Sequence, residues 1–345
     1  MSQPTTYSTG HEVLDKKIEE LLALADIQSD SEYFHDMFVT VLKFAADKPS
    51  PKDIKLFSRS IKEMRYASKV FQPYYGVKKL SIFGSARTSE KAAEYQAAES
   101  FARLMMEASY MVITGGGHGI MGAAQAGAGR ERSFALNIEL PFEQQANSTI
   151  EGDPKLINFR YFFTRKLHFI KNSHAIVLMP GGFGTMDEGF EAMTLIQTGK
   201  TNVVPVVLLD APGGNFWRTF IHYIQEHLLN DGLISADDFH LLKVTDNINE
   251  ARKEILNFYY NFHSYRYVGD QLVIRTQREI PPAAVIRLLE DFHDILTDEN
   301  SLKTCAFLPE EINEPEIAHL PRLCLKFDRR SHGRLRQLID RLNLF

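Results

Sequence analysis

This chain of 345 residues has only two cysteines and no excess of positive charge, and each of these shortages excludes a class of protein. The two cysteines, Cys305 and Cys324, form no Cys-x-x-Cys pair and no Cys/His cluster, so we expect neither a disulfide framework nor a structural zinc site. The net charge is -5, with 39 basic against 44 acidic residues, which argues against a general nucleic-acid binder. These shortages favour a reducing compartment and a small-molecule ligand.

Long apolar runs are missing as well. No stretch approaches the ~18 apolar residues that a membrane span needs, and the polar start from Met1 to Gly10 lacks a signal-peptide pattern. With 44% hydrophobic and 24% charged residues, the composition is that of a globular protein with one large core and appended elements. We therefore expect a cytoplasmic protein that binds neither membrane nor nucleic acid.

From Lys79 onwards, short apolar runs end in glycine turns and alternate with alanine-rich helical stretches. Five runs have this β-type character: 80–83, 111–114, 135–138, 175–178 and 203–209. Alternation of strands and helices predicts an α/β fold with a doubly wound, Rossmann-like parallel sheet.

The chain outside this region has a different pattern. Apolar spacing over residues 10–75 predicts helices, and residues 266–274 read as a β-hairpin. We therefore expect a helical N-terminal extension at 1–77, a nucleotide-binding domain at 78–260, and a C-terminal α/β extension at 261–345 that packs on the core.

Three of the expected strands run directly into glycine loops. One loop, Pro180-Gly-Gly-Phe-Gly-Thr-Met-Asp-Glu188, opens a helix, whose free N–H groups and partial positive charge suit a phosphate. The other two are Gly84-Ser-Ala-Arg87 and the run from Gly115 to Gly122. Because ligands of doubly wound sheets bind at the carboxyl ends of strands near a switch point, we expect the three loops to converge on one crevice.

Charged residues near the third loop indicate more than phosphate binding. Acidic residues so close to the start of an anion-binding helix are unfavourable for phosphate alone, so Asp187 and Glu188 indicate chemistry on a phosphorylated ligand. Arg165 and Lys166 have the pattern of a solvated helix face when taken alone. They precede the strand that leads into the loop, however, so the guanidinium of Arg165 could reach phosphate or sugar oxygens in the crevice.

A second interpretation rests on the glycine run after residue 114. Gly117, Gly119 and Gly122 form a Gly-x-Gly-x-x-Gly, and Glu139 follows at a later strand end, as in the dinucleotide fingerprint. An NAD-dependent oxidoreductase is therefore an alternative, although such a fold needs one glycine loop where this chain has three. His118 and His168 lack a third group that would complete a triad, and we expect both to be structural.

Three motifs of this chain occur together: Pro-Gly-Gly-x-Gly-Thr-x-x-Glu at 180–188, the pair Arg165-Lys166, and the glycine run from Gly115. In this combination the chain resembles the Lonely Guy (LOG) family of nucleoside 5′-monophosphate phosphoribohydrolases, which are often mislabelled lysine decarboxylases. The resemblance covers roughly residues 78–260, and the extensions are similar to those of longer bacterial members. It implies hydrolysis of the N-glycosidic bond of AMP-like or cytokinin-type nucleotides to base and ribose 5-phosphate. It also implies no metal or redox cofactor, and a homodimer or a larger assembly of dimers.

By motif position, the resemblance makes Arg165 and Glu188 catalytic. Glu188 would stabilise an oxocarbenium-like state and activate water, while Arg165 would position the ribose or phosphate and keep Glu188 ionised. The substrate-binding positions that we expect are Gly84, Ser85, Gly115, Gly116, Gly117, Gly119, Met121, Lys166, Gly181, Gly182, Phe183, Gly184, Thr185, Asp187 and Thr194.

Two other functions give different expectations. A non-catalytic nucleotide sensor or carrier on the same fold would keep the glycine loops but would need neither Arg165 nor Glu188. A lysine decarboxylase would need pyridoxal phosphate or an equivalent electron sink, and no motif in the chain supplies one.

Overall fold

The structure is a computed structural model that describes residues 7–27, 29–140 and 145–345, so part of the predicted N-terminal extension, residues 1–6, lies outside it. The chain forms two compact units, Met1–Arg65 and Tyr66–Phe345. The helices of the N-terminal region are α1 (Glu12–Leu24), α2 (Ser31–Ala46) and α3 (Pro51–Phe71). The predicted helical character of this region is therefore confirmed where the structure describes it, and the three-part domain division stays a prediction.

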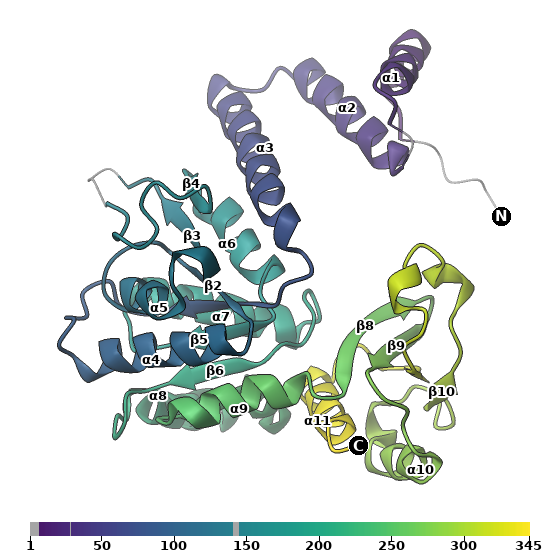
Figure 1. The fold of residues 1–345 in the computed structure, drawn as a ribbon. Helices are drawn as coiled ribbons and strands as arrows, with labels where there is room; N and C mark the ends of the chain where they lie inside the picture. Colours follow the sequence, from purple (N-terminus) through teal and green to yellow (C-terminus); the bar gives the residue numbers. More distant parts are fainter. Residues whose placement is uncertain (1–6, 28, 141–144) are drawn as a thin grey trace. The chain divides into compact units, whose positions relative to one another are not determined.

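The second unit is built on a seven-stranded sheet with the order β4-β3-β2-β1-β5-β6-β7 (Figure 1). Every neighbouring pair in it is parallel. The strands are β1 (Lys79–Phe83), β2 (Met111–Thr114), β3 (Ser133–Ile138), β4 (Leu156–Phe159), β5 (Ala175–Leu178), β6 (Val206–Leu209) and β7 (Leu242–Thr245). The strand order reverses between β1 and β5, which makes this pair the switch point of a doubly wound, Rossmann-like sheet.

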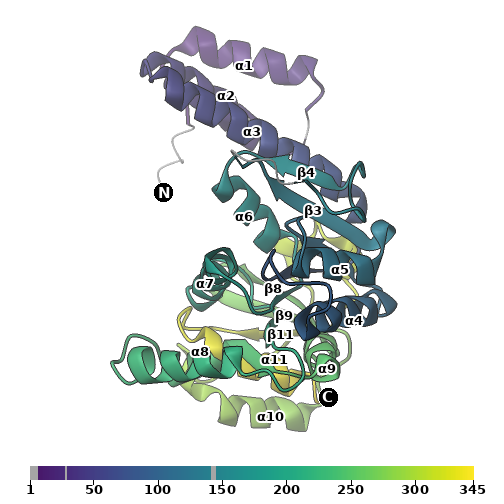
Figure 2. The same ribbon diagram turned by 90° about the vertical axis from the view of Figure 1, so that its left-hand side faces the viewer.

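Helices cover both faces of this sheet. One apolar cluster joins Leu80 and Ile82 of β1 to α4 (Ala93–Glu107), α5 (Ile120–Ala128) and α9 (Ile248–Phe258). On the other face are α6 (Phe162–Lys171), α7 (Phe183–Gln197) and α8 (Phe216–Ile224), and Figure 2 shows α7 and α8 on the opposite side from α4 and α9. Because both faces are buried, the strands are continuous apolar runs, and this is why they could be recognised in the sequence.

The C-terminal part of the second unit adds a four-stranded antiparallel sheet with the order β10-β11-β9-β8. Its elements are β8 (Phe262–Val268), β9 (Gln271–Thr276), α10 (Pro282–Asp291), β10 (Lys303–Cys305), β11 (Arg322–Leu325) and α11 (His332–Leu342). The predicted hairpin is confirmed as β8 and β9, which turn at Gly269 with a φ of 61°. Leu272 and Leu323 of this sheet belong to the same apolar cluster as Ile113 of β2, so the two sheets share one core.

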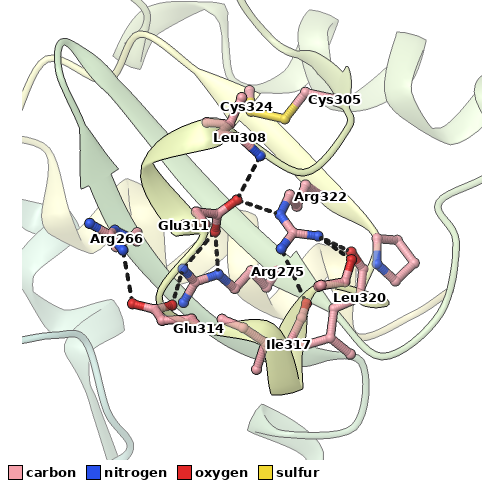
Figure 3. Close-up of polar contacts among 12 residues, drawn as sticks. Arg266, Arg275, Cys305, Leu308, Glu311, Glu314, Ile317, Leu320, Arg322 and Cys324 are labelled. Carbon is pink, nitrogen blue, oxygen red and sulfur yellow. Dashed lines mark hydrogen bonds and ion pairs between the residues drawn. A yellow bond between two sulfur atoms is a disulfide. The ribbon is translucent and has the colours of Figure 1, made fainter.

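The cysteine expectation is wrong, because Cys305 and Cys324 form a disulfide (Figure 3). The two residues lie on neighbouring strands, β10 and β11, with their Cα atoms 6.1 Å apart, which is within the range for a disulfide. A sequence separation of 19 residues gave no sign of this pairing. In the described ranges, none of the helices combines the length and apolar character needed to cross a lipid bilayer, and a cytoplasmic location stays a prediction.

Candidate active site

The three glycine loops meet, as the sequence predicts. The N–H of Ser85, after β1, donates to the carbonyl of Pro180, after β5, at 3.1 Å. The N–H of Ile120 donates to the carbonyl of Ser85 at 3.0 Å, and this joins the loop after β2 to the same group. A Cβ atom at Gly119 would clash with the carbonyl of Ser85, so glycine is needed there for the backbones to pack.

The loops line a cavity of 650 Å³ at the carboxyl ends of the strands, a volume typical of small-molecule sites. Ten of the expected site residues line it: Gly84, Ser85, Gly115, Met121, Arg165, Gly182, Phe183, Gly184, Thr185 and Glu188. The cavity is therefore at the switch point between β1 and β5, where the fold is expected to place a ligand.

The carboxyl group of Glu188 lies in the second turn of α7, where it is almost fully buried at 2% exposure. Burial raises its pKa to about 7, although the charges of Arg165 and Lys166 act in the opposite direction. Its Oε1 atom is 3.5 Å from Nη2 of Arg165, and its buried Oε2 atom has no hydrogen-bond partner in the described structure. The expectation that Arg165 keeps Glu188 ionised needs correction, because the attraction does not outweigh burial.

Arg165 is held by its own helix. Its guanidinium stacks on Phe162, one turn earlier, and on Phe169, one turn later, at 5.2 and 5.5 Å from the ring centroids. All three residues line the cavity. Cation–π contacts of this kind fix the plane of a guanidinium, so Arg165 presents a preoriented cation to the cavity.

Lys166 does not line the cavity. Its Nζ atom pairs with Asp187 at 2.8 Å and with Glu191 at 2.6 Å, so it joins α6 to α7. Although burial lowers it, hydrogen bonds with these two acids raise the pKa of Lys166 overall. Lys166 and Asp187, both expected to bind substrate, therefore pair with each other in this structure, which also accounts for an acidic residue in the first turns of α7.

Five more expected residues lie outside the lining. Gly116, Gly117, Gly119 and Gly181 shape the loops from behind, and the buried Nδ2 of Asn147 donates to the carbonyls of Gly116 and Gly117 at 3.0 and 2.9 Å. Thr194 lines a separate cavity of 170 Å³ with apolar side chains of α7 and α8. The structure thus gives the four glycines a supporting position and does not bring Thr194 to Glu188.

The start of α7 has the features of an anion site. Gly182 is its N-cap residue, and a Cβ atom at Gly182 or Gly184 would meet nothing within 4 Å, so both glycines leave open space in front of the helix N-terminus. Thr185 adds a hydroxyl and Arg87 a positive charge to the lining. In residues 7–27, 29–140 and 145–345, no group of three His, Cys, Asp or Glu side chains is placed to hold a metal ion.

Comparison with known proteins assigns the chain to a family. Residues 121–255 match the family model described as "Possible lysine decarboxylase". The chain is 30% identical over 148 residues, 41% of its length, to the cytokinin riboside 5′-monophosphate phosphoribohydrolase of Mycobacterium tuberculosis, of which it covers 74%. The chain therefore belongs to the LOG family.

Further similarity fits this LOG assignment. The cytokinin riboside 5′-monophosphate phosphoribohydrolase LOG5 of Arabidopsis thaliana is 23% identical over 205 residues, which cover 59% of this chain and 85% of the plant protein. Among solved structures, the molybdenum cofactor carrier protein of Chlamydomonas reinhardtii is 20% identical over 52% of this chain and 98% of that chain, with a TM-score of 0.36. We draw no conclusion from a likeness with so low a score.

The LOG-family span includes both catalytic candidates, because residues 121–255 run from α5 to α9. Residues that line the cavity without being among the expected site residues include Arg87, Asn137 and Leu140. Arg87 belongs to a glycine loop that was expected to border the crevice, Asn137 lies near the carboxyl end of β3, and Leu140 follows that strand. The rule that ligands meet the carboxyl ends of strands was the signal that would have found the last two.

The remaining candidates have structural roles. Glu139, the acid of the dinucleotide interpretation, is 3.5 Å from Arg160 and does not line the cavity. His168 is buried against Phe71 and Phe159, and burial lowers its pKa to about 4. The histidine is therefore neutral at physiological pH, as expected of a structural residue.

Proposed function

We propose that this chain hydrolyses the N-glycosidic bond of nucleoside 5′-monophosphates, AMP-like or cytokinin-type, and releases a free base and ribose 5-phosphate. The observation that carries the proposal is the buried Glu188 carboxyl, with its unpartnered Oε2 atom, in a cavity that begins at the N-terminus of α7. The names of its relatives in Mycobacterium tuberculosis and Arabidopsis thaliana describe the same class of reaction on cytokinin nucleotides.

The phosphate would bind at the N-terminus of α7. Gly182 and Gly184 leave open space at the start of the helix, and Thr185 lines the same cavity. The unpaired N–H groups and the dipole of a helix N-terminus favour an anion there. Glu188 is one turn further along the same helix. A bound phosphate would therefore hold the ribose close to the carboxyl group, and its binding energy would help to maintain the reactive geometry.

Glu188 would act on the water that attacks the ribose. Its carboxylate accepts a proton from water at Oε2, the water oxygen bonds to C1′, and the bond from C1′ to the base nitrogen breaks with its electron pair on the base. The base then takes up a proton, so that one water is consumed for each base released. A carboxyl pKa of about 7 suits proton transfer near neutral pH, and the negative charge stabilises the oxocarbenium-like sugar.

The test is release of ribose 5-phosphate from a panel of nucleoside 5′-monophosphates by the native chain and by Glu188→Gln. We expect hydrolysis of at least one nucleotide, with a loss of roughly 10²–10⁴-fold in kcat for the variant. Glu191→Gln is the matched control, because Glu191 lies one turn further along α7 and pairs with Lys166 outside the cavity. We expect that variant to keep its rate within a few-fold of the native one.

Three results would contradict the proposal. Nucleotide binding without any release would favour a non-catalytic sensor or carrier with the same loops. Equal losses in the Glu188 and Glu191 variants would show that the carboxyl group in the cavity has no special role. Binding of a nicotinamide cofactor with no binding of monophosphates would favour the oxidoreductase interpretation.

A further inference from the structure

The cavity beside Glu188 extends beyond the places proposed for the phosphate and the ribose. It begins at the N-terminus of α7, which follows β5, and its lining reaches Asn137 near the end of β3 and Leu140 just after that strand. The sheet order places β1 and β2 between β5 and β3, so the two ends are three strand spacings apart, roughly 14 Å at about 4.8 Å each. With the phosphate at α7 and C1′ near Glu188, the end at β3 is left for the base.

The end of the cavity at β3 has apolar walls on two sides. Met121 belongs to α5 and Phe162 to α6, and these two helices cover opposite faces of the sheet. Both side chains line the cavity, together with Ile138 and Leu140. A flat aromatic ring suits such a space, because it has a large apolar area to bury on each of its faces.

Asn137 is the polar side chain at this end of the cavity. Its Nδ2 atom donates to Oδ1 of Asn158 at 3.0 Å, and the two residues lie directly opposite each other on β3 and β4. This bond holds the carboxamide of Asn137, while its Oδ1 atom and its second N–H have no partner among the residues that the structure describes. Asn137 therefore offers one acceptor and one donor, side by side, at an apolar end of the cavity.

This pair of groups matches one edge of a 6-aminopurine. Adenine presents N7 as an acceptor beside its N6 amino group as a donor, and an asparagine carboxamide binds both with two hydrogen bonds. A 6-oxopurine presents acceptors at both positions, so the carbonyl oxygen of Asn137 would face an oxygen that cannot donate. The side chain thus distinguishes the two classes of purine.

We propose that Asn137 binds the N7 and N6 edge of a 6-aminopurine and stabilises this base as it leaves. The inference rests on the proposed hydrolase function. When the bond from C1′ to the base nitrogen breaks, its electron pair enters the ring and part of the negative charge develops on N7. A donor already aimed at N7 stabilises that charge. An amide does not give up its proton, so the proton that the base takes up comes from water.

Two comparisons of nucleotides test the contacts one at a time. IMP has an oxygen at C6, and we expect kcat/KM for ribose 5-phosphate release to be roughly 10–100-fold higher for AMP than for IMP, as for other bidentate contacts to a base. In 7-deaza-AMP a carbon replaces N7, which also slows loss of the base by itself, so this nucleotide is used for binding alone. We expect the Glu188→Gln chain to bind it about fivefold more weakly than AMP, for the loss of one hydrogen bond.

The matching change in the protein is Asn137→Leu, which keeps the size of the side chain and removes both polar atoms. We expect this variant to hydrolyse AMP and IMP with kcat/KM values within a few-fold of each other. Combined with Glu188→Gln, it should bind AMP and 7-deaza-AMP equally. The control is Glu139→Gln, because Glu139 is two residues further along, lies near Arg160 and does not line the cavity. That variant should keep the native preference for AMP.

The outcomes separate this inference from the proposed function. Hydrolysis of AMP and IMP with equal kcat/KM by the native chain would overturn the inference and leave the hydrolase intact, and so would a preference for AMP that persists in Asn137→Leu. If no nucleotide is hydrolysed, tighter binding of AMP than of IMP and 7-deaza-AMP, lost in Asn137→Leu, would support base recognition by Asn137 in a chain that is not a hydrolase. Absence of AMP binding would overturn both proposals.

Discussion

At the residue scale, the properties of Glu188 come from two opposing influences. Burial raises its pKa and the positive charge of Arg165 lowers it, and the result is a pKa of about 7. Arg165 is itself fixed by Phe162 and Phe169, so the distance between the two charges is set by α6 and α7 rather than by solvent. A carboxyl group held in this way can take up and give back a proton at neutral pH.

We predict that the pH dependence of ribose 5-phosphate release reports this carboxyl group. The base form is the carboxylate, so kcat/KM should rise as pH rises through about 7 and then level off. Replacement Arg165→Gln removes the attraction that lowers the pKa, so the rise should move to higher pH and the maximal rate should fall. Full pH profiles of both chains check this prediction.

The control for this prediction is Lys166→Met. Lys166 also lowers the pKa of Glu188, but less than Arg165 does, so its removal should shift the profile in the same direction by a smaller amount. A profile that does not change in either variant, or one that moves to lower pH, would assign the ionisation to another group.

At the scale of elements, close packing of the three loops restricts which positions in them can carry a side chain. A Cβ atom at Gly84 would clash with Ile120, and one at Gly181 would clash with Thr185 and lie 3.1 Å from the N atom of Ser85. At Gly182 the same atom would meet nothing within 4 Å. Neighbouring glycines in one loop are therefore required for different reasons. Gly181 allows the loops to pack against each other, and Gly182 leaves room for a ligand.

We predict opposite effects for the two alanine variants. Gly181→Ala overpacks the contact between loops and should destabilise the fold by about 1–3 kcal/mol. Gly182→Ala should leave the unfolding temperature within a few degrees of the native value but weaken nucleotide binding, because its methyl group enters the space in front of α7. Thermal unfolding and a nucleotide titration of both variants distinguish the two. Equal destabilisation with unchanged binding would contradict the assignment of Gly182 to the ligand side.

The same loops show how far the sequence could predict the site. Strands β1, β2, β3, β5 and β6 were recognisable because burial on both faces makes a continuous apolar run, and their glycine turns predicted where a ligand would bind. The pairing of Lys166 with Asp187 and Glu191 was not predictable, because it depends on which sides of α6 and α7 face each other. Thr194 was misplaced for the same reason: it lies on a different side of α7 from Glu188.

At the scale of the whole second unit, the segment between β10 and β11 is tied to the C-terminal sheet by more than apolar contacts. Glu311, which is fully buried, accepts hydrogen bonds from Arg275 and Arg322 at 2.6 and 2.7 Å, and Arg322 also donates to the carbonyl of Ile317 (Figure 3). Although burial raises it, these hydrogen bonds lower the pKa of Glu311 overall. The segment between the two cysteines is thus held by a charged cluster along its length and by a covalent bond at its ends.

This double attachment leads to a prediction for reduction of the disulfide. Opening the bond releases a loop of 19 residues and should cost about 3 kcal/mol, or roughly 5–10 °C in unfolding temperature. The rate of ribose 5-phosphate release at 25 °C should stay unchanged, because the charged cluster still holds the segment and the cavity around Glu188 is lined from the other sheet. Thermal unfolding and activity with and without dithiothreitol measure both effects.

The variant with Cys305→Ser and Cys324→Ser separates loss of the bond from side effects of the reductant. It should unfold at the temperature of the reduced native chain and should not respond to dithiothreitol. Loss of activity in parallel with reduction of the disulfide would contradict this prediction. It would show that the two sheets are coupled through their shared apolar core, although the cavity and the disulfide lie in different sheets. If the unfolding temperature does not change at all, the cluster around Glu311 alone determines how firmly the segment is held.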